Sequence, residues 1–311
     1  MPPMAAPIVD RYRDRVVANA TGLFKHADYP LADTLSYGGD PGLFGPGSVT
    51  WEVVGDSAAF LGGVRALLVQ ACHPEVAAGV AEHSRYREDP LGRLSRTSNY
   101  VTATCYGAMP EVEEAVRLVR AVHRRVAGTS HRGVPYAAGM PPFAAWVHNA
   151  LTDSFLVAYR RFGRRRLSTA EEDRFVEEQT RVGALLDADP MPATGADLAA
   201  WLEHHAGADR SPGMTEAVAF LKSPPLPFTT KVGYRLLFAA AAATLPVRLR
   251  RILGLRRFPG AIVIGRVTVR FLRWALGSSP SWHLALVRTG APVPDGLFRQ
   301  PLPPEAVGGD G

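Results

Sequence analysis

The sequence of 311 residues contains little cysteine and lysine, and no long apolar run. Its two cysteines, Cys72 and Cys105, are too few for a disulfide framework and lack the spacing of a metal site. The longest apolar run, residues 236–245, is much shorter than the roughly 20 residues that a membrane-spanning helix needs. Charges interrupt the first twenty residues, where a signal peptide would have an apolar core. These absences predict a protein that stays in the cytoplasm.

Arginine carries nearly all of the positive charge, because only three lysines accompany it in a chain of net charge +6. Abundant arginine, alanine and glycine are typical of a GC-rich bacterial genome. A nucleic-acid-binding protein would concentrate its basic residues in a stripe interleaved with aromatic side chains. Here the arginines are dispersed, apart from residues 160–166 and 248–257. Nucleic acid is therefore not expected as a partner.

Proline and glycine divide the chain into helical segments. The pattern predicts a helical stretch over residues 56–83 that breaks at Pro74, because proline cannot continue a helix. Further helices are predicted over residues 90–107, 110–128 and 141–163, each beginning near a proline, which the first turn tolerates, and ending at a glycine.

The second half continues in the same way. Ser168 and Glu171 have the spacing of a capping box at the start of a helix. Residues 231–255 are predicted to be helical with an interruption at Pro246, and only residues 261–269 have the composition of a strand.

These elements predict an all-α fold with one helical domain. We expect an N-terminal arm over residues 1–35, the helical domain over residues 36–290, and a flexible tail over residues 291–311, which is rich in glycine and proline.

One histidine shares a face with valines on the predicted helix of residues 110–128. Val112, Val116, Val119, His123 and Val126 recur at helical spacing, so the imidazole of His123 is expected to point toward the core. The conservative interpretation is a core histidine with a hydrogen-bonded ring. The functional interpretation is a metal or haem ligand, since haem needs only one strong protein ligand.

His148 lies in a similar setting on the next helix, beside Leu151 and Phe155. No pair of histidines has the HExxH pattern or another close spacing with carboxylates, which disfavours a zinc or di-iron site. Isolated histidines on separate helices fit haem better.

Two arginines share a face with hydroxyl groups on the helix of residues 90–107. Arg93, Arg96, Thr97, Tyr100 and Thr104 follow the spacing i, i+3, i+4, i+7 and i+11. This face is either a solvated surface with ordinary salt bridges or a set of donors for an anionic or oxygen-bearing ligand.

These residues lie within three longer motifs. They are LLVQACHPEVAAGVAEHSRYREDPLGRLSRT, which ends at Thr97, then VRAVHRRVAG around His123, and WVHNALTDSFL around His148. Together they resemble the haem-dependent oxygenase family of the latex-clearing protein, a rubber oxygenase, and of the oxygenase of mycophenolic acid biosynthesis. The resemblance is close over about residues 40–165 and looser to about residue 260.

The resemblance implies a globin-like helical core that holds haem b through one proximal histidine, and dioxygen chemistry on a double bond of an isoprenoid chain. The family pattern Arg-x-x-Lys-Thr aligns with Arg93-Leu-Ser-Arg96-Thr97, which makes these three the expected catalytic residues. His123 aligns with the proximal histidine and is the expected iron ligand. The expected cofactor-binding residues are His123, Arg93, Arg65 and His148, with His148 ranked second as a ligand.

Arg96 departs from the family pattern, which has lysine at this position. Lysine can lose its proton and coordinate iron, whereas arginine effectively cannot, so a lysine-ligated resting state is not expected. The acidic base of the family has three candidates in the corresponding region, namely Glu75, Glu82 and Glu88.

The first hypothesis is therefore a haem b-dependent oxygenase acting with dioxygen on an apolar small molecule of isoprenoid or lipid type. The alternative is a non-catalytic helical protein that binds haem or lipid and docks on membranes. Residues 248–277 motivate it, because they mix arginine with large apolar residues as interfacial segments do; an ordinary core helix with a basic outer face would show the same pattern. A third hypothesis is a scaffold that has lost its cofactor.

Overall fold

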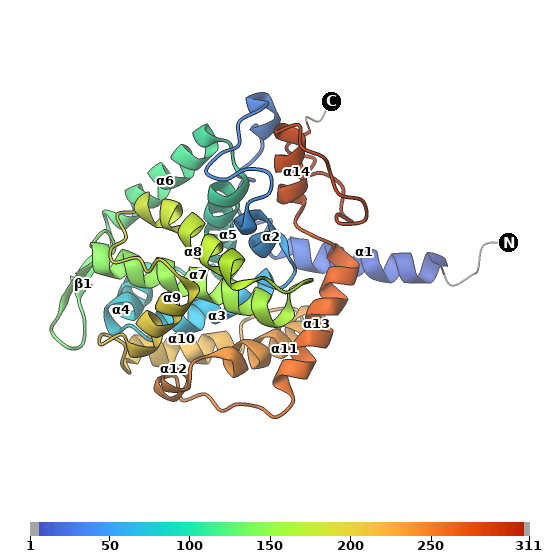
Figure 1. Cartoon of the computed structure of the whole chain (residues 1–311). Helices are drawn as coiled ribbons and strands as arrows, with labels where there is room; N and C mark the ends of the chain where they lie inside the picture. The colour runs from blue at the N-terminus through green and yellow to red at the C-terminus, as the bar shows by residue number, and fades with distance from the viewer. Residues whose placement is uncertain (1–5, 308–311) are drawn as a thin grey trace.

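The computed structural model describes residues 6–307 and shows a single all-α domain (Figure 1). Its first seven helices are α1 (Ala6–Gly22), α2 (Val49–Gly55), α3 (Ala59–Ala71), α4 (Pro74–His83), α5 (Pro90–Tyr106), α6 (Met109–His123) and α7 (Pro141–Phe162). The remaining ones are α8 (Thr169–Ala184), α9 (Gly195–His204), α10 (Pro212–Lys222), α11 (Phe228–Thr244), α12 (Val247–Ile252), α13 (Ala261–Leu276) and α14 (Pro280–Arg288). A short 3₁₀ helix η1 (Thr34–Tyr37) and an antiparallel pair of strands, β1 (Ala127–Thr129) and β2 (Pro135–Ala137), complete the described elements.

Local capping interactions set several helix starts, as predicted. Pro74 separates α3 from α4, and α5 begins where the Asp89 side chain accepts a hydrogen bond of 2.9 Å from the backbone N–H of Gly92. Ser168 and Glu171 form the capping box of α8.

Two predicted elements are wrong. Residues 261–269 belong to helix α13 and form no strand, because Ala261, Gly265 and Val269 recur at helical spacing and are buried, with α11 packed against the helix. The third predicted helix ends at His123 and does not reach Gly128; the residues after it form β1, which pairs with β2.

Helix α3 lies at the centre of the domain, packed against α7 on one side and α11 on another (Figure 1). Leu68 of α3 and Trp146 of α7 are fully buried, together with Phe175 and Leu198 of the helices beyond α7. This packing fixes α3, and with it the neighbouring cavity described below.

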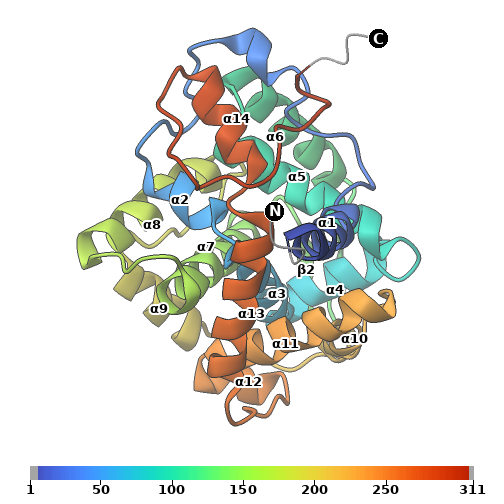
Figure 2. The ribbon, with the colours of Figure 1, turned by 90° about the vertical axis from the view of Figure 1, so that its right-hand side faces the viewer.

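The N-terminal arm and the C-terminal tail both attach to the domain. Helix α1 lies against α13, where the rings of Tyr12 and Phe271 are 6.2 Å apart (Figures 1 and 2). The tail, which we predicted to be flexible, has no helix over residues 291–307. The backbone N–H of Ser278 donates to the carbonyl of Leu297 at 3.0 Å, and Ala306 is buried.

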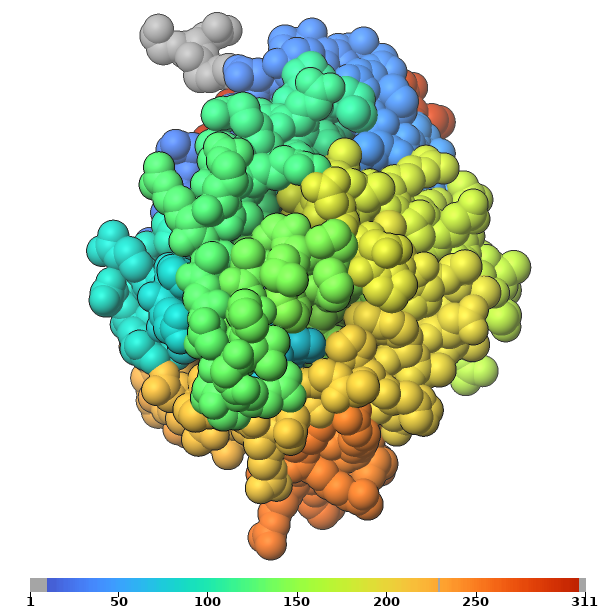
Figure 3. Space-filling view, turned by 90° about the vertical axis from the view of Figure 1, so that its left-hand side faces the viewer, coloured from blue at the N-terminus to red at the C-terminus, as the bar shows by residue number. Residues whose placement is uncertain are grey.

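The loop between α12 and α13 projects from one end of the molecule (Figure 3). Among residues 6–307, no helix is both long and apolar enough to cross a bilayer.

Candidate active site

A cavity of about 1750 Å³ lies among α1, α3, α5, α11 and α13. Its lining is mainly apolar, and its volume exceeds the roughly 300–1,000 Å³ that most small-molecule pockets need. It can therefore hold a large apolar molecule. The described residues that line it include no histidine.

Helix α5 supplies polar side chains to this apolar wall. Arg93 and Thr97, one turn apart, both line the cavity, and neither side chain has an ion pair or hydrogen-bond partner among residues 6–307. The Arg93 guanidinium lies 5.9 Å from the centre of the Tyr86 ring, in cation–π range. Burial lowers the pKa of Arg93, although the group stays charged, because the charged form loses hydration without gaining a counter-ion.

Arg96 does not line this cavity. Its side chain is 57% exposed and pairs with Asp89 at 3.2 Å, the residue that caps α5. Hydrogen bonding from the backbone of Gly92, and then the pairing with Arg96, lower the pKa of Asp89. The structure thus separates Arg96 from Arg93 and Thr97, which the sequence grouped on one face.

His123 is the last residue of α6, the helix that packs against α5. It is half-buried, and its ring makes no hydrogen bond to the described residues. Burial lowers the pKa of His123, so the imidazole is neutral at pH 7 and its unprotonated nitrogen is available to a ligand.

The hydroxyl of Tyr100 marks a second unsatisfied group near α6. It is buried without a hydrogen-bond partner among residues 6–307, an arrangement that costs free energy unless a ligand or water satisfies it. Burial raises the pKa of Tyr100, and Arg120, one turn from His123 on α6, is close enough to oppose that rise.

His148 faces another direction. Its ring lies against α8, where a Cβ added to Gly183 would be only 2.9 Å from Cδ2 of the imidazole. The hydroxyl of Thr152 lies 3.4 Å from Nε2. Burial lowers the pKa of His148 to about 4, so it too is neutral, and like His123 it is half-buried.

Arg65, expected among the cofactor contacts, is fully buried in an ion pair. Its guanidinium donates to Oδ2 of Asp153 at 2.6 Å and to the hydroxyl of Ser154 at 2.8 Å, which joins α3 to α7. Its Nε is buried without a hydrogen-bond partner among the described residues.

The three candidate acidic bases all lie outside the cavity lining. Glu75 is buried and accepts hydrogen bonds from Ser130 and Arg132, Glu82 accepts one from Tyr136, and Glu88 is exposed beside Arg85.

Sequence reasoning missed the surroundings of Glu75. Nδ1 of His73 lies 3.2 Å from Oε2 of Glu75 without the orientation of a hydrogen bond, and the ring packs against those of Trp146 and His205. The His-Pro pair at the start of α4 was the only signal in the sequence.

The donor set near α5 and α6 fits a haem better than a metal ion bound by protein alone. Within residues 6–307, no group of three His, Cys, Asp or Glu side chains could hold a metal ion. A haem needs a single neutral imidazole from the protein, and the half-buried ring of His123 is neutral and makes no hydrogen bond to the described residues.

The comparisons with known proteins identify one family. The family model described as "ER-bound oxygenase mpaB/B'/Rubber oxygenase, catalytic domain" matches residues 51–274, well over half of the chain. The match includes α5 with Arg93, Arg96 and Thr97, and α6 with His123. No curated protein matches the chain, and neither does any solved structure.

Proposed function

Because the chain belongs to the family of the mpaB and rubber oxygenases, we propose that it is a haem b-dependent oxygenase that uses dioxygen to oxidise or cleave an apolar small molecule. Membership of an oxygenase family makes the chain an oxidoreductase; haem b and an isoprenoid or lipid-like substrate are our extension.

The observation that carries the proposal is the position of α5. One part of this helix presents Arg93 and Thr97 to a large apolar cavity, and the helix also packs against α6, whose His123 has an uncommitted neutral ring. We infer that α5 lies between a cofactor site at His123 and the substrate cavity.

We assign these residues the following roles. His123 holds the iron of haem b, which when bound supplies the centre that activates dioxygen. Arg93 pairs with a carboxylate, either a haem propionate or an acidic group of the substrate, since arginine binds carboxylates with two parallel hydrogen bonds. Thr97 donates its hydroxyl proton toward the reacting oxygen atoms. Arg96 must first release Asp89 to reach a ligand, so its catalytic role is the weaker assignment.

The cavity lining supports the substrate class. Phe60, Leu67, Val101 and Phe155 contribute apolar surface from three helices, and an apolar chain would displace water from it with a free-energy gain of about 25 cal/mol per Å² buried. Membrane contact through residues 248–277 is a second, independent proposal, supported by Val263 and Val267 on α13, which are 60% and 64% exposed.

The first experiment measures haem. Protein expressed with ample haem precursor should contain about one haem b per chain by the pyridine haemochrome assay. His123→Ala should lose most of it, because the variant lacks the imidazole that we assign as the iron ligand. His148→Ala is the matched control, since it removes a neutral, half-buried imidazole that lies against α8.

A wild-type protein with well under half an equivalent of haem would refute the cofactor and leave the family assignment intact. Loss of haem in His148→Ala but not in His123→Ala would refute only the choice of ligand.

A further inference from the structure

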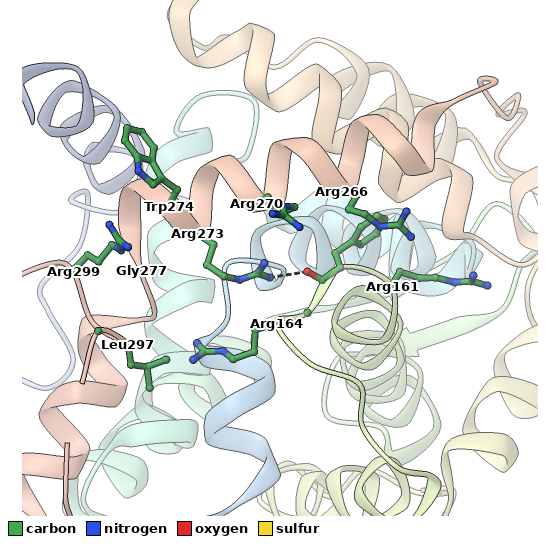
Figure 4. A pocket seen from close by; sticks show the side chains of 12 residues that line it. Arg161, Arg164, Arg266, Arg270, Arg273, Trp274, Gly277, Leu297 and Arg299 are labelled. Atoms are coloured by element: carbon green, nitrogen blue, oxygen red, sulfur yellow. Dashed lines mark hydrogen bonds between the residues drawn. The ribbon is translucent and has the colours of Figure 1, made fainter. Parts of the chain in front are cut away.

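A second recess lies on the other side of α13 from the large cavity. It has a volume of about 440 Å³ and is formed by α13, the end of α7 and the segment around residues 296–299 (Figure 4). Six arginines line it, from all three segments: Arg161, Arg164, Arg266, Arg270, Arg273 and Arg299.

Two of these arginines share one carboxylate. The guanidinium of Arg273 donates to both oxygens of Asp56, at 2.7 and 3.0 Å, and to the carbonyl of Phe162 at 2.6 Å. Arg164 lies 3.6 Å from the same buried Asp56. This ion-pair cluster fixes one wall of the recess, and its single negative charge is already used.

The other four arginines have no carboxylate. Among residues 6–307, the side chains of Arg161, Arg266, Arg270 and Arg299 make neither an ion pair nor a hydrogen bond. The neighbouring Arg160 and Arg165 differ sharply, because they pair with Glu172 and Glu52 at 2.6 and 2.7 Å.

This arrangement concentrates positive charge in one place. Guanidinium groups that surround a recess repel one another, and the repulsion is relieved when a multiply charged anion enters. Phosphate oxygens match the fork of donors on arginine, which binds them with paired hydrogen bonds. Trp274 and Leu297 at the same recess offer apolar contact to the organic part of a phosphate ester.

We propose that this recess is a binding site for a phosphate group, carried either by a small molecule such as a diphosphate or phosphate ester or by the headgroup of an anionic phospholipid. The site lies apart from α5 and α6 and does not depend on the proposed haem chemistry.

The test uses the whole chain and has two arms. In the first, isothermal titration calorimetry measures binding of inorganic diphosphate. In the second, sedimentation measures binding to phosphatidylcholine vesicles with and without phosphatidylglycerol. In whichever assay the wild type binds, the double variant Arg266→Gln/Arg270→Gln should weaken the affinity at least about tenfold. That is the effect of losing one charge-assisted hydrogen bond. Added sodium chloride should weaken the binding as well, because salt screens the attraction between the arginines and the phosphate.

The matched control is Lys222→Gln/Arg235→Gln, which removes the same charge from exposed residues outside both the recess and residues 248–277. Diphosphate binding lost only in the recess variant identifies a small phosphate ligand, whereas vesicle binding that needs phosphatidylglycerol and the recess arginines identifies a lipid headgroup. The proposal is overturned if the wild type shows neither diphosphate binding nor vesicle binding that needs phosphatidylglycerol, or if the recess variant loses no more of that binding than the control variant.

Thermal unfolding gives a readout that does not depend on the choice of probe. Without any anion, the recess variant should unfold at a temperature equal to or higher than that of the wild type, because removing two charges relieves repulsion. A clearly lower unfolding temperature would show that these arginines serve the fold, and would overturn the proposal.

Discussion

Arg65 on α3 is buried and Arg93 on α5 is half-buried, and their charges have different surroundings. Arg65 is enclosed with its own counter-ion, Asp153, at 2.6 Å and bonds Ser154 as well. Arg93 borders a cavity and has only the face of Tyr86 beside it, without a carboxylate among residues 6–307.

The difference separates a structural charge from one that is available to a ligand. A buried ion pair satisfied within the protein belongs to the packing of α3 against α7, since removing one partner strands the other. A desolvated arginine without a counter-ion raises the free energy of the empty protein and lowers it again when an anionic group binds.

The largest effect on the free energy of unfolding should come from breaking the buried ion pair between Arg65 and Asp153. Asp153→Ala leaves the Arg65 guanidinium buried and unpaired, which should lower the free energy of unfolding by about 3–5 kcal/mol. Asp153→Asn keeps an acceptor for the hydrogen bond and should cost less. Urea unfolding of both variants measures this, and a loss below about 1 kcal/mol for Asp153→Ala would erase the distinction between the two arginines.

The closed interior should also show itself in acid. Burial lowers the pKa of His73 from 6.5 to about 4. Between these pH values, His73 is therefore protonated in the unfolded chain and neutral in the folded protein. Stability should therefore fall as pH falls from about 6.5 to 4, with His73 contributing up to about 3 kcal/mol of the loss.

A comparison of the wild type with His73→Gln isolates the contribution of His73 to the pH dependence of stability. The variant should show a shallower dependence of unfolding free energy on pH within that window, whatever its stability at pH 7. Parallel curves for the two proteins would mean that His73 is accessible to protons in the folded state.

The smallest effect on stability should come from the open arginine. Arg93→Gln breaks no ion pair with the described residues and loses the contact with Tyr86. The free energy of unfolding should therefore change by about 1 kcal/mol or less. Its haem content should fall instead. Arg96→Gln, which removes an exposed partner of Asp89, should keep its haem. Equal retention of haem by both variants would remove Arg93 from the proposed cofactor site.

The sequence predicted those parts of the fold that local chemistry decides. The break at Pro74, the start of α5 at Asp89-Pro90 and the capping box of Ser168 each depend on a few adjacent residues. It failed at residues 261–269, where β-branched side chains suggested a strand, because burial against α11 favours the helical spacing of the same residues.

The candidate site was predictable to the same extent. Helical spacing placed Arg93 and Thr97 on one face, and both line the cavity. The spacing could not reveal that Arg96 forms an ion pair with the cap residue Asp89 at the exposed surface. Nor could it reveal that Arg65 forms a buried ion pair with Asp153. The cavity itself could not be predicted from the sequence, since its walls come from helices as distant in the sequence as α1 and α13.

Helix α1 has a consequence for how such proteins diversify. Its residues between Tyr12 and Thr21 and residues 300–305 of the tail line the large cavity, yet both segments lie outside residues 51–274, the part that the family model matches. Arg93 and Thr97 lie inside that part. Substitutions in the two terminal segments can therefore reshape the space offered to a substrate while the shared core stays unaltered, so that selectivity and chemistry can evolve separately in one chain.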